Sequence, residues 1–575
     1  MIHAVFLAAV VVAGGADFQR LLDEEWEARL REEPLLASSV GDHRYDDRLP
    51  SVAPADLERA VARRRATLDR LQAIDRAGLD TQDRISYDML RRELNDDVAD
   101  YEFGSWRLPI NADSGFHTGL AELPRYTSFR TTRDYENYVA RLRAFPTYFH
   151  QQIANMREGI RTGFTQPKVV LEGYDGTIRA HVVADPDESV FSAPFRTFPP
   201  GVPEGDRARL VAEGRKAVME GVAAYRAFLD FMTGEYLPRC RDTIGASELP
   251  RGREYYAYLV RRFTTLDVTP EQVHKLGLGE VARIHAEMLD VIAKVGFLGD
   301  FAAFFKFLRT DPRFYAKTPE ELLKNASFIA KKMDGKLPSL FGRLPRLPYG
   351  VEPVPAHLAP KYTGGRYVEA PVGGTRAGTY WVNTYALESR PFYTQEALTL
   401  HEAVPGHHLQ IALQQEMENV PPFRRAAGVG AFAEGWGLYS ERLGLESGFY
   451  QDPYSNFGRL TYEMWRACRL VVDTGLHAFG WSREKAMDFM ASNTALSLHE
   501  VRTETDRYIS WPGQALAYKM GELKIRELRR LAETELGQNF DVRGFHDAIL
   551  ASGPVPLPVL EEQMRAYIAA TKRRQ

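Results

Sequence analysis

The sequence predicts a mostly α-helical protein with one small β-sheet, and three observations lead to this fold class. Apolar residues recur at helical spacing through most of the chain. A single aromatic and β-branched stretch, residues 378–385, is typical of a strand. The chain has 575 residues, 44% of them hydrophobic, which is enough for a large core and for two or more lobes.

Amphipathic helices are predicted through the first part of the chain. Residues 17–33, 57–73 and 86–98 each place apolar side chains on one face and charged side chains on the other. The proline- and glycine-rich residues 191–205 predict a loop. Helices then resume over residues 206–236.

A helix start is predicted where the sequence reads Thr269-Pro270-Glu271. Threonine is a good N-cap and proline suits the first helical position, so we expect a helix from here to about Val295. Residues 344–378, rich in proline and glycine, are predicted to be irregular, and helices dominate after the strand. We expect an N-terminal helical lobe of residues 17–255 and a catalytic lobe of residues 256–575.

Charge and cysteine content exclude several classes of protein. The chain has 73 basic and 77 acidic residues, and a net charge of −4 argues against binding of nucleic acid. Two cysteines, Cys240 and Cys468, exclude a disulfide scaffold and a cysteine-rich metal site. Whether they pair is left open, and two separate buried thiols are expected.

The N-terminus resembles a short secretory signal. Residues 4–15 are uncharged and mostly apolar, and small residues precede a possible cleavage point after Ala16. Residues 1–16 are therefore predicted to be a signal peptide of a periplasmic or secreted protein. The alternative is a cytoplasmic protein with an apolar N-terminus. No later stretch is apolar enough to span a bilayer, so no stable membrane insertion is expected after signal removal.

Three histidines occur within eight residues, in His401-Glu-Ala-Val-Pro-Gly-His407-His408. Zinc binds neutral imidazoles and carboxylates in a tetrahedron, and a catalytic site leaves one position open. The usual helical motif is His-Glu-x-x-His, with the glutamate as general base. Here Pro405 occupies the position of the second histidine. The pattern therefore predicts a Zn²⁺ site with an altered second ligand.

Pro405 predicts a break in the helix, because it cannot donate the backbone bond to His401 and its ring crowds that turn. On a regular helix His408 would return to the face of His401, about 10.5 Å further along. His407 would serve instead if about two residues were looped out. The residues alone leave both possibilities open.

The third metal ligand is predicted from sequence distances to the expected turn at Pro421. Pro421-Pro422 should turn the chain, and Glu434 lies 13 residues after Pro421, whereas His407 lies 14 before it. A helical hairpin would bring Glu434 level with the histidines. Gly430 and Gly437 lie one turn to either side of Glu434 and would let another backbone approach closely.

These motifs resemble the DUF885 family of bacterial proteins, which is grouped with gluzincin-like metallopeptidases. The resemblance rests on residues 401–410 and on Phe-Ala-Glu-Gly-Trp-Gly-Leu-Tyr-Ser-Glu at 432–441, with further support at 263–270 and 507–518. It covers residues 17–575 as one unit. It implies a zincin-like fold with helical lobes around a cleft and a small sheet beside the zinc helix. It also implies His401 and Glu434 as ligands, Glu402 as base, and His407 as second ligand.

Several other residues are candidates for contacts with substrate. Tyr508 and Tyr518, on either side of a Pro-Gly turn with Gln514, could donate to a developing oxyanion, although such tyrosines can also be packing residues. Asn383 lies on the predicted strand, which could hold an extended peptide at a sheet edge or only cover the helices. His408, if it is not a ligand, would orient a ligand or contact substrate.

The predicted function is that of a zinc metallopeptidase that cleaves short peptides. The alternatives are a zinc hydrolase of non-peptide amides or esters, and a non-catalytic scaffold that holds a metal. An intact Glu402 argues against the scaffold, because a structural site needs no base. The sequence does not predict the peptide preference or the oligomeric state.

Overall fold

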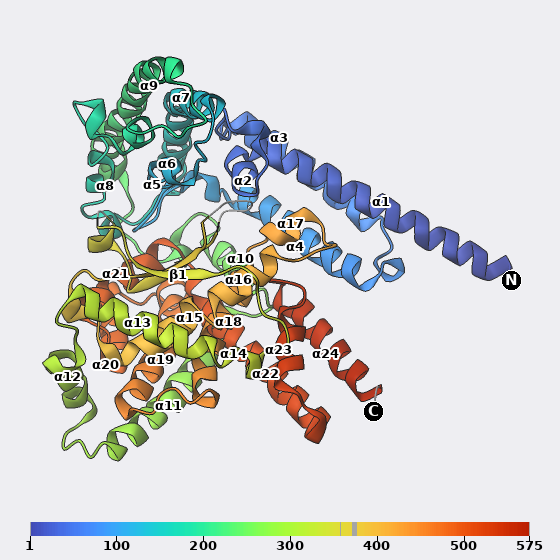
Figure 1. The fold of residues 1–575 in the computed structure, drawn as a ribbon, viewed down its shortest axis with the longest axis vertical. Helices are drawn as coiled ribbons and strands as arrows, with labels where there is room; N and C mark the ends of the chain where they lie inside the picture. The colour runs from blue at the N-terminus through green and yellow to red at the C-terminus, as the bar shows by residue number, and fades with distance from the viewer. Residues whose placement is uncertain (1, 357, 371–375, 574–575) are drawn as a thin grey trace. The chain divides into compact units, whose positions relative to one another are not determined.

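A computed structural model describes residues 2–356, 358–370 and 376–573, and Figure 1 shows its ribbon. The protein is mostly helical with one three-stranded sheet, as predicted. The chain divides into two compact units. The first comprises residues up to 244 and 248–252, and the second comprises residues 245–247 and almost all that follow residue 252. Among the described residues, no helix is both long and apolar enough to cross a bilayer.

The first unit is helical throughout. Its helices are α1 (Ile2–Glu32), α2 (Pro34–Ser39), α3 (Pro54–Gln72), α4 (Thr81–Phe103), α5 (Phe116–Ala121), α6 (Leu123–Tyr126), α7 (Thr132–Thr162), α8 (Asp175–Arg179) and α9 (Glu204–Phe231). The predicted helices of this region are confirmed by α1, α3, α4 and α9. Helices α7 and α9 pack along each other around buried aromatic rings such as Phe149 and Tyr225. The segment predicted as a loop begins with a 3₁₀ helix, Val190–Phe195, and is otherwise irregular.

The expected signal sequence falls in the first part of α1. The side chains of residues 1–14 lie outside the described residues, so the expectation of a signal peptide stays a prediction.

The second unit holds the remaining long helices and the sheet. Its helices are α10 (Gly252–Thr264), α11 (Pro270–Lys294), α12 (Phe301–Thr310), α13 (Pro319–Asp334), α14 (Leu337–Leu340), α15 (Gln395–Glu402), α16 (His407–Gln415), α17 (Pro422–Ala426), α18 (Gly430–Glu446), α19 (Pro453–Ala478), α20 (Arg483–Asn493), α21 (Leu498–Ser510), α22 (Ala517–Leu536), α23 (Val542–Leu550) and α24 (Leu557–Arg573). The predicted start of α11 is confirmed: Thr269 is its N-cap and accepts a hydrogen bond from the Gln272 amide. Helix α19 is buried along nearly its whole length and packs against α11.

The sheet corrects two predictions. Its strands are β1 (Tyr349–Pro353), β2 (Gly365–Val368) and β3 (Gly378–Val382), in the order β1-β3-β2. β3 is the predicted strand, but it lies in the centre of the sheet, parallel to β1 and antiparallel to β2, and not at an edge. β1 and β2 come from the stretch predicted to be irregular, because four- and five-residue strands beside glycine and proline carry no readable period. In Figure 1 the sheet lies beside α13 and α15, and both helices contact it.

Candidate metal centre

The helix break predicted at Pro405 is confirmed. α15 ends at Glu402, residues 403–406 form a turn, and α16 begins at His407. Gly406 packs on the preceding helix so closely that a Cβ there would lie 1.8 Å from the carbonyl oxygen of His401, so only glycine fits. The indole Nε1 of Trp436 donates to the carbonyl of Pro405 at 2.8 Å and holds the turn against α18. The break brings His407 back beside His401.

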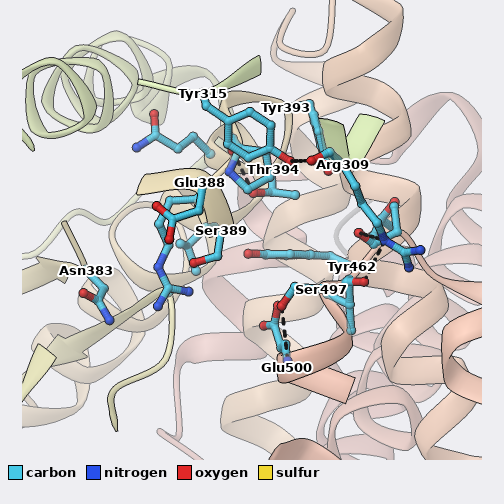
Figure 2. A pocket seen from close by; sticks show the side chains of 18 of the residues that line it. Arg309, Tyr315, Asn383, Glu388, Ser389, Tyr393, Thr394, Tyr462, Ser497 and Glu500 are labelled. Carbon is cyan, nitrogen blue, oxygen red and sulfur yellow. Dashed lines mark hydrogen bonds between the residues drawn. The ribbon is translucent and has the colours of Figure 1, made fainter. Parts of the chain in front are cut away.

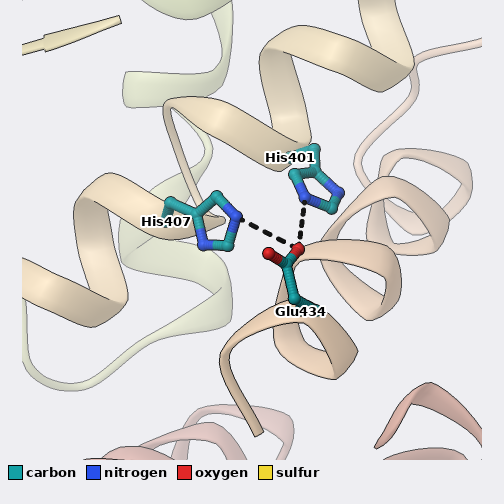
Figure 3. A group of neighbouring side chains, drawn as sticks. All are labelled: His401, His407 and Glu434. Atoms are coloured by element: carbon teal, nitrogen blue, oxygen red, sulfur yellow. Dashed lines mark ion pairs between the residues drawn. The ribbon is translucent and has the colours of Figure 1, made fainter. Parts of the chain in front are cut away.

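His401, His407 and Glu434 form a compact cluster in which each side chain offers one ligand atom, all within 4.8 Å of one another. The Nε2 atoms of His401 and His407 lie 3.4 Å and 3.5 Å from Oε2 of Glu434. Figure 3 shows both rings directed at this carboxylate. Three elements, α15, α16 and α18, thus converge on one point.

His408 lies apart from the cluster, although it follows His407 directly. It is buried, its Nδ1 is 3.0 Å from the hydroxyl of Tyr367, and its ring packs on Tyr349 at 4.4 Å between centroids. Burial lowers the pKa of His408 to about 4, so it is neutral at pH 7. Its surroundings are those of a core histidine that supports the sheet.

Glycine lets α18 approach the cluster closely. A Cβ at Gly437 would lie 2.6 Å from Cε1 of the His401 ring, so the imidazole rests directly on the helix backbone. Gly430 was also expected to permit a close approach, but a Cβ added there would meet nothing nearer than Ala517 at 3.9 Å. Gly435 instead packs α18 on Gly521 of α22.

Glu441 is part of the centre and was missed by the sequence analysis. Its Oε1 lies 2.8 Å from Nδ1 of His401, and Nη2 of Arg466 lies 3.5 Å from the same oxygen. A carboxylate on the far nitrogen of a ligand histidine fixes the ring orientation and leaves Nε2 for the metal. Glu441 follows Glu434 by seven residues, or two helical turns, so its helical register could have identified it.

Charge is balanced within the cluster by ion pairing. Burial by itself lowers the pKa of His401, but hydrogen bonds with Glu434 and Glu441 outweigh this and raise it to about 9. Burial opposes ionisation of Glu434, yet the two histidines hold its pKa well below the usual range. Nδ1 of His407 is buried and has no hydrogen-bond partner among the described residues.

The spacing of the ligand atoms fits a tetrahedral metal ion. Zinc lies about 2.0–2.1 Å from nitrogen and carboxylate ligands, so ligand atoms on a tetrahedron lie about 3.3–3.4 Å from one another. Oε2 of Glu434 lies 3.4 Å and 3.5 Å from the two histidine nitrogens, and these two distances match this edge. Two imidazoles and one carboxylate are also the donor set of a catalytic zinc site with an open position.

Glu402 follows His401 directly but is outside the group of ligand atoms. Its Oε2 accepts a hydrogen bond from the backbone amide of Tyr367 on β2 at 2.8 Å, and its Oε1 has no partner among the described residues. Arg366, next on the same strand, lies in the field of Glu402, which helps to raise its pKa against the effect of burial. The strand therefore fixes the carboxylate that the sequence predicts as base.

The predicted tyrosines have different surroundings. Burial and the charge of Glu434 raise the pKa of Tyr518, so its hydroxyl stays a neutral donor. Gln514 links Tyr518 to Arg507, whose Nη1 donates to its Oε1 at 2.7 Å.

Tyr508 lies in a separate hydrogen-bond network. Its hydroxyl accepts from Trp465 at 2.9 Å and from Arg469 at 2.8 Å, and it donates to Glu504 at 2.7 Å. No hydrogen-bonding capacity is left for a substrate, so Tyr508 serves to position its neighbours.

Asn383, predicted to contact substrate, is fully buried and bonded within the chain. Its Nδ2 donates to the carbonyls of Ala359, Tyr362 and Thr363, and its Oδ1 accepts from the amide of Tyr385. The amide therefore anchors the turn before β2 and is not free to bind a peptide.

Comparison with known proteins gives a family and a fold. A family model described as "Bacterial protein of unknown function (DUF885)" matches residues 34–564. No curated protein matches the chain.

Two solved structures are similar over nearly the whole chain. One, described as a "putative lipoprotein" from Colwellia psychrerythraea, has a TM-score of 0.89 and 28% identity, and the match covers 96% of this chain and 99% of that one. Another, a "putative lipoprotein of unknown function" from Shewanella oneidensis, has a TM-score of 0.72 and covers 95% and 99%. Its 19% identity shows a shared fold alone.

Proposed function

The chain belongs to the DUF885 family, and we propose that it is a zinc-dependent hydrolase, a metallopeptidase of the gluzincin-like group that cleaves short peptides. The proposed metal ligands are His401, His407 and Glu434. The observation that carries the proposal is their convergence, with tetrahedral spacing, directly beside a carboxylate that is not itself a ligand. A purely structural zinc site would be closed by a fourth protein ligand.

Zinc bound by this cluster would supply Lewis acidity, which lowers the pKa of water and polarises a carbonyl group. Glu402 is the proposed general base: its Oε1 takes a proton from water and passes it to the leaving amine. Tyr367 holds the other oxygen of Glu402 in place. Tyr518 is the proposed donor to the oxyanion, because burial and the charge of Glu434 keep its hydroxyl protonated.

Metal analysis coupled to a peptide-library cleavage assay tests the proposal. The purified protein should contain about one zinc per chain and cleave peptides, and chelation should abolish cleavage until zinc is restored. Glu402→Gln should keep its zinc and lose roughly 10²–10⁴-fold in activity, as expected for a lost general base. Loss of metal and activity together would make Glu402 a ligand instead.

The same assay separates the proposed function from its rivals. If the protein hydrolyses esters or non-peptide amides but cleaves no peptide, it is a zinc hydrolase with a non-peptide substrate. If the protein binds its full complement of metal but hydrolyses none of these substrates, the remaining alternative is a non-catalytic scaffold.

We also propose that residues 1–16 are an export signal and that the protein acts in the periplasm or outside the cell. One similar structure is described as a "putative lipoprotein", and lipoproteins are exported proteins. N-terminal sequencing from the native host should find Asp17 first. An intact Met1 in the cytosol would refute export.

A further inference from the structure

A cavity of about 200 Å³ lies within the second unit, and one of its lining residues, Leu398, is on α15, the helix that carries His401. Its walls come from α15, α19, α21 and the segments that flank the sheet. Figure 2 shows tyrosines on one side, with Tyr462 crossing the space, and Glu500 below it. The proposed hydrolysis gives this cavity no role.

Two residues of the wall, Arg390 and Thr461, have a buried polar side-chain atom without a hydrogen-bond partner among the described residues, and only Arg390 is charged. Its Nε is buried and has no partner among the described residues, and its Nη2 makes only a long contact, 3.4 Å, with the carbonyl of Tyr362. Arg309, the other arginine of the wall, instead donates to the carbonyls of Thr494 and Leu496 and is committed to the backbone. A buried guanidinium N–H without an acceptor costs free energy unless a ligand supplies one.

The cavity reaches the residue that precedes β2, the strand that binds the proposed base. Gly364 lines it, and a Cβ at Gly364 would lie 3.9 Å from Nη1 of Arg390 and 4.0 Å from the hydroxyl of Tyr462. Tyr367, whose amide binds Glu402, is three residues further along, about 10 Å in an extended chain. A peptide lying along β2 at the level of Glu402 would therefore reach Arg390 after two or three residues.

The acidic residues of the wall do not neutralise Arg390 fully. Glu388 is exposed at the rim. Burial raises the pKa of Glu500 to about 7 against the opposing charges of Arg390, Arg466 and Arg469, so at neutral pH it carries only part of a charge. The cavity thus combines a partly buried cationic fork with hydroxyl donors, and a carboxylate is the group that matches both.

We propose that this cavity binds a carboxylate of the peptide substrate and that Arg390 is its specificity-determining partner. The inference rests on the proposed peptidase function and adds a substrate class to it. The distance along β2 favours the C-terminal carboxylate of a short peptide, two or three residues beyond the bond that is cut. An acidic side chain has the same chemistry, and the test separates the two sources.

Binding is measured with the zinc-loaded Glu402→Gln protein, which leaves peptides intact. The probes are an N-acetylated tetra-alanine peptide as free acid, the same peptide as C-terminal amide, and the amide with glutamate as its last residue. The free acid should bind about 30-fold or more tightly than the alanine amide. Adding Arg390→Ala should abolish this preference, and Arg390→Lys should restore part of it. Arg502→Ala removes an exposed arginine from α21, the helix that carries Glu500, and is the matched control that should change nothing.

Equal binding of acid and amide, or a preference that survives Arg390→Ala, overturns the inference. So does a lack of binding by all three peptides. If the glutamate amide binds as well as the free acid, the carboxylate site stands and accepts acidic side chains. Turnover by the unmodified protein is scored separately, so a failure of the peptidase proposal is recognised independently of the binding result.

Discussion

At the scale of single residues, neighbouring histidines have different roles because the helix breaks between His401 and His407. His407 faces Glu434, whereas the next side chain points into the core beside Tyr367. Adjacent residues on a helix are about 100° apart, so one cannot replace the other. The assignment of the second ligand therefore depends on the turn that precedes α16.

Parallel substitutions test this assignment. His407→Asn should lose most of its zinc, because the ligand set falls to two. His408→Asn should keep its zinc, since asparagine preserves a polar partner for Tyr367. Zinc content after purification in buffered zinc decides the matter. A filled site in His407→Asn together with an empty one in His408→Asn would reverse the assignment.

Glu441 acts on the metal through His401 and gives a second prediction. Glu441→Gln removes the charge that orients the imidazole, so the affinity for zinc should fall roughly 10- to 100-fold without loss of a ligand. Competition with a chromophoric chelator measures this. Glu446→Gln, on the exposed face of the same helix, is the control. If Glu441→Gln binds zinc as tightly as the wild type, the carboxylate of Glu441 acts only as the ion-pair partner of Arg466.

At the scale of elements, α18 must lie close to α15 for the centre to form. Gly437→Ala would place a methyl group 2.6 Å from the His401 ring, and such overpacking costs about 1–3 kcal/mol of stability. It should also weaken zinc binding by moving the imidazole.

Gly430→Ala is the matched control on the same helix, since its added methyl would meet no atom closer than 3.9 Å. Thermal unfolding with and without zinc compares the two. Equal melting temperatures for both variants would mean that α18 can shift without cost.

At the scale of the whole molecule, a buried ionic network joins α11, α19 and α22. Nζ of Lys519, which is fully buried, lies 3.0 Å from Glu280, 2.9 Å from Glu463 and 3.0 Å from Glu522. Removing one member of a buried charge group leaves the others uncompensated. This network fixes the helix that carries Tyr518.

Lys519→Met should therefore lower the free energy of unfolding by about 3–5 kcal/mol, measured by urea denaturation. Lys572→Met removes an exposed ion pair with Glu535 and should cost less than about 1 kcal/mol. A Lys519→Met protein as stable as wild type would show that hydrophobic packing alone holds these helices.

The same network predicts a pH dependence. Burial opposes ionisation of Glu280, but Arg283 and Lys519 lower its pKa to about 2 from the usual 4.5. The stability it adds is complete above pH 4.5 and is lost as the pH falls towards 2. The difference in unfolding free energy between wild type and Glu280→Gln should therefore fall towards zero as the pH is lowered over this range. A difference that stays constant from about pH 5 to about pH 3 would contradict the pairing.

Features that depend on local order could be predicted from the sequence. Helical periodicity predicted α3, α4 and α9, and the Thr269-Pro270 pair predicted the start of α11, because caps and amphipathic faces are set within a few turns. Pro405 predicted the helix break for the same reason. The spacing around Pro421 also predicted that Glu434 would lie level with the histidines.

Features that depend on contacts between distant segments could not be predicted from the sequence. β1 and β2 are too short to be recognised alone, and they form by pairing with β3. That pairing places the amide of Tyr367 on Glu402 and commits Asn383 to the turn before β2. It also puts Arg390 beside Gly364, at the start of β2. A side chain's partner across a sheet or between helices depends on the packing of the whole unit, which no local spacing records.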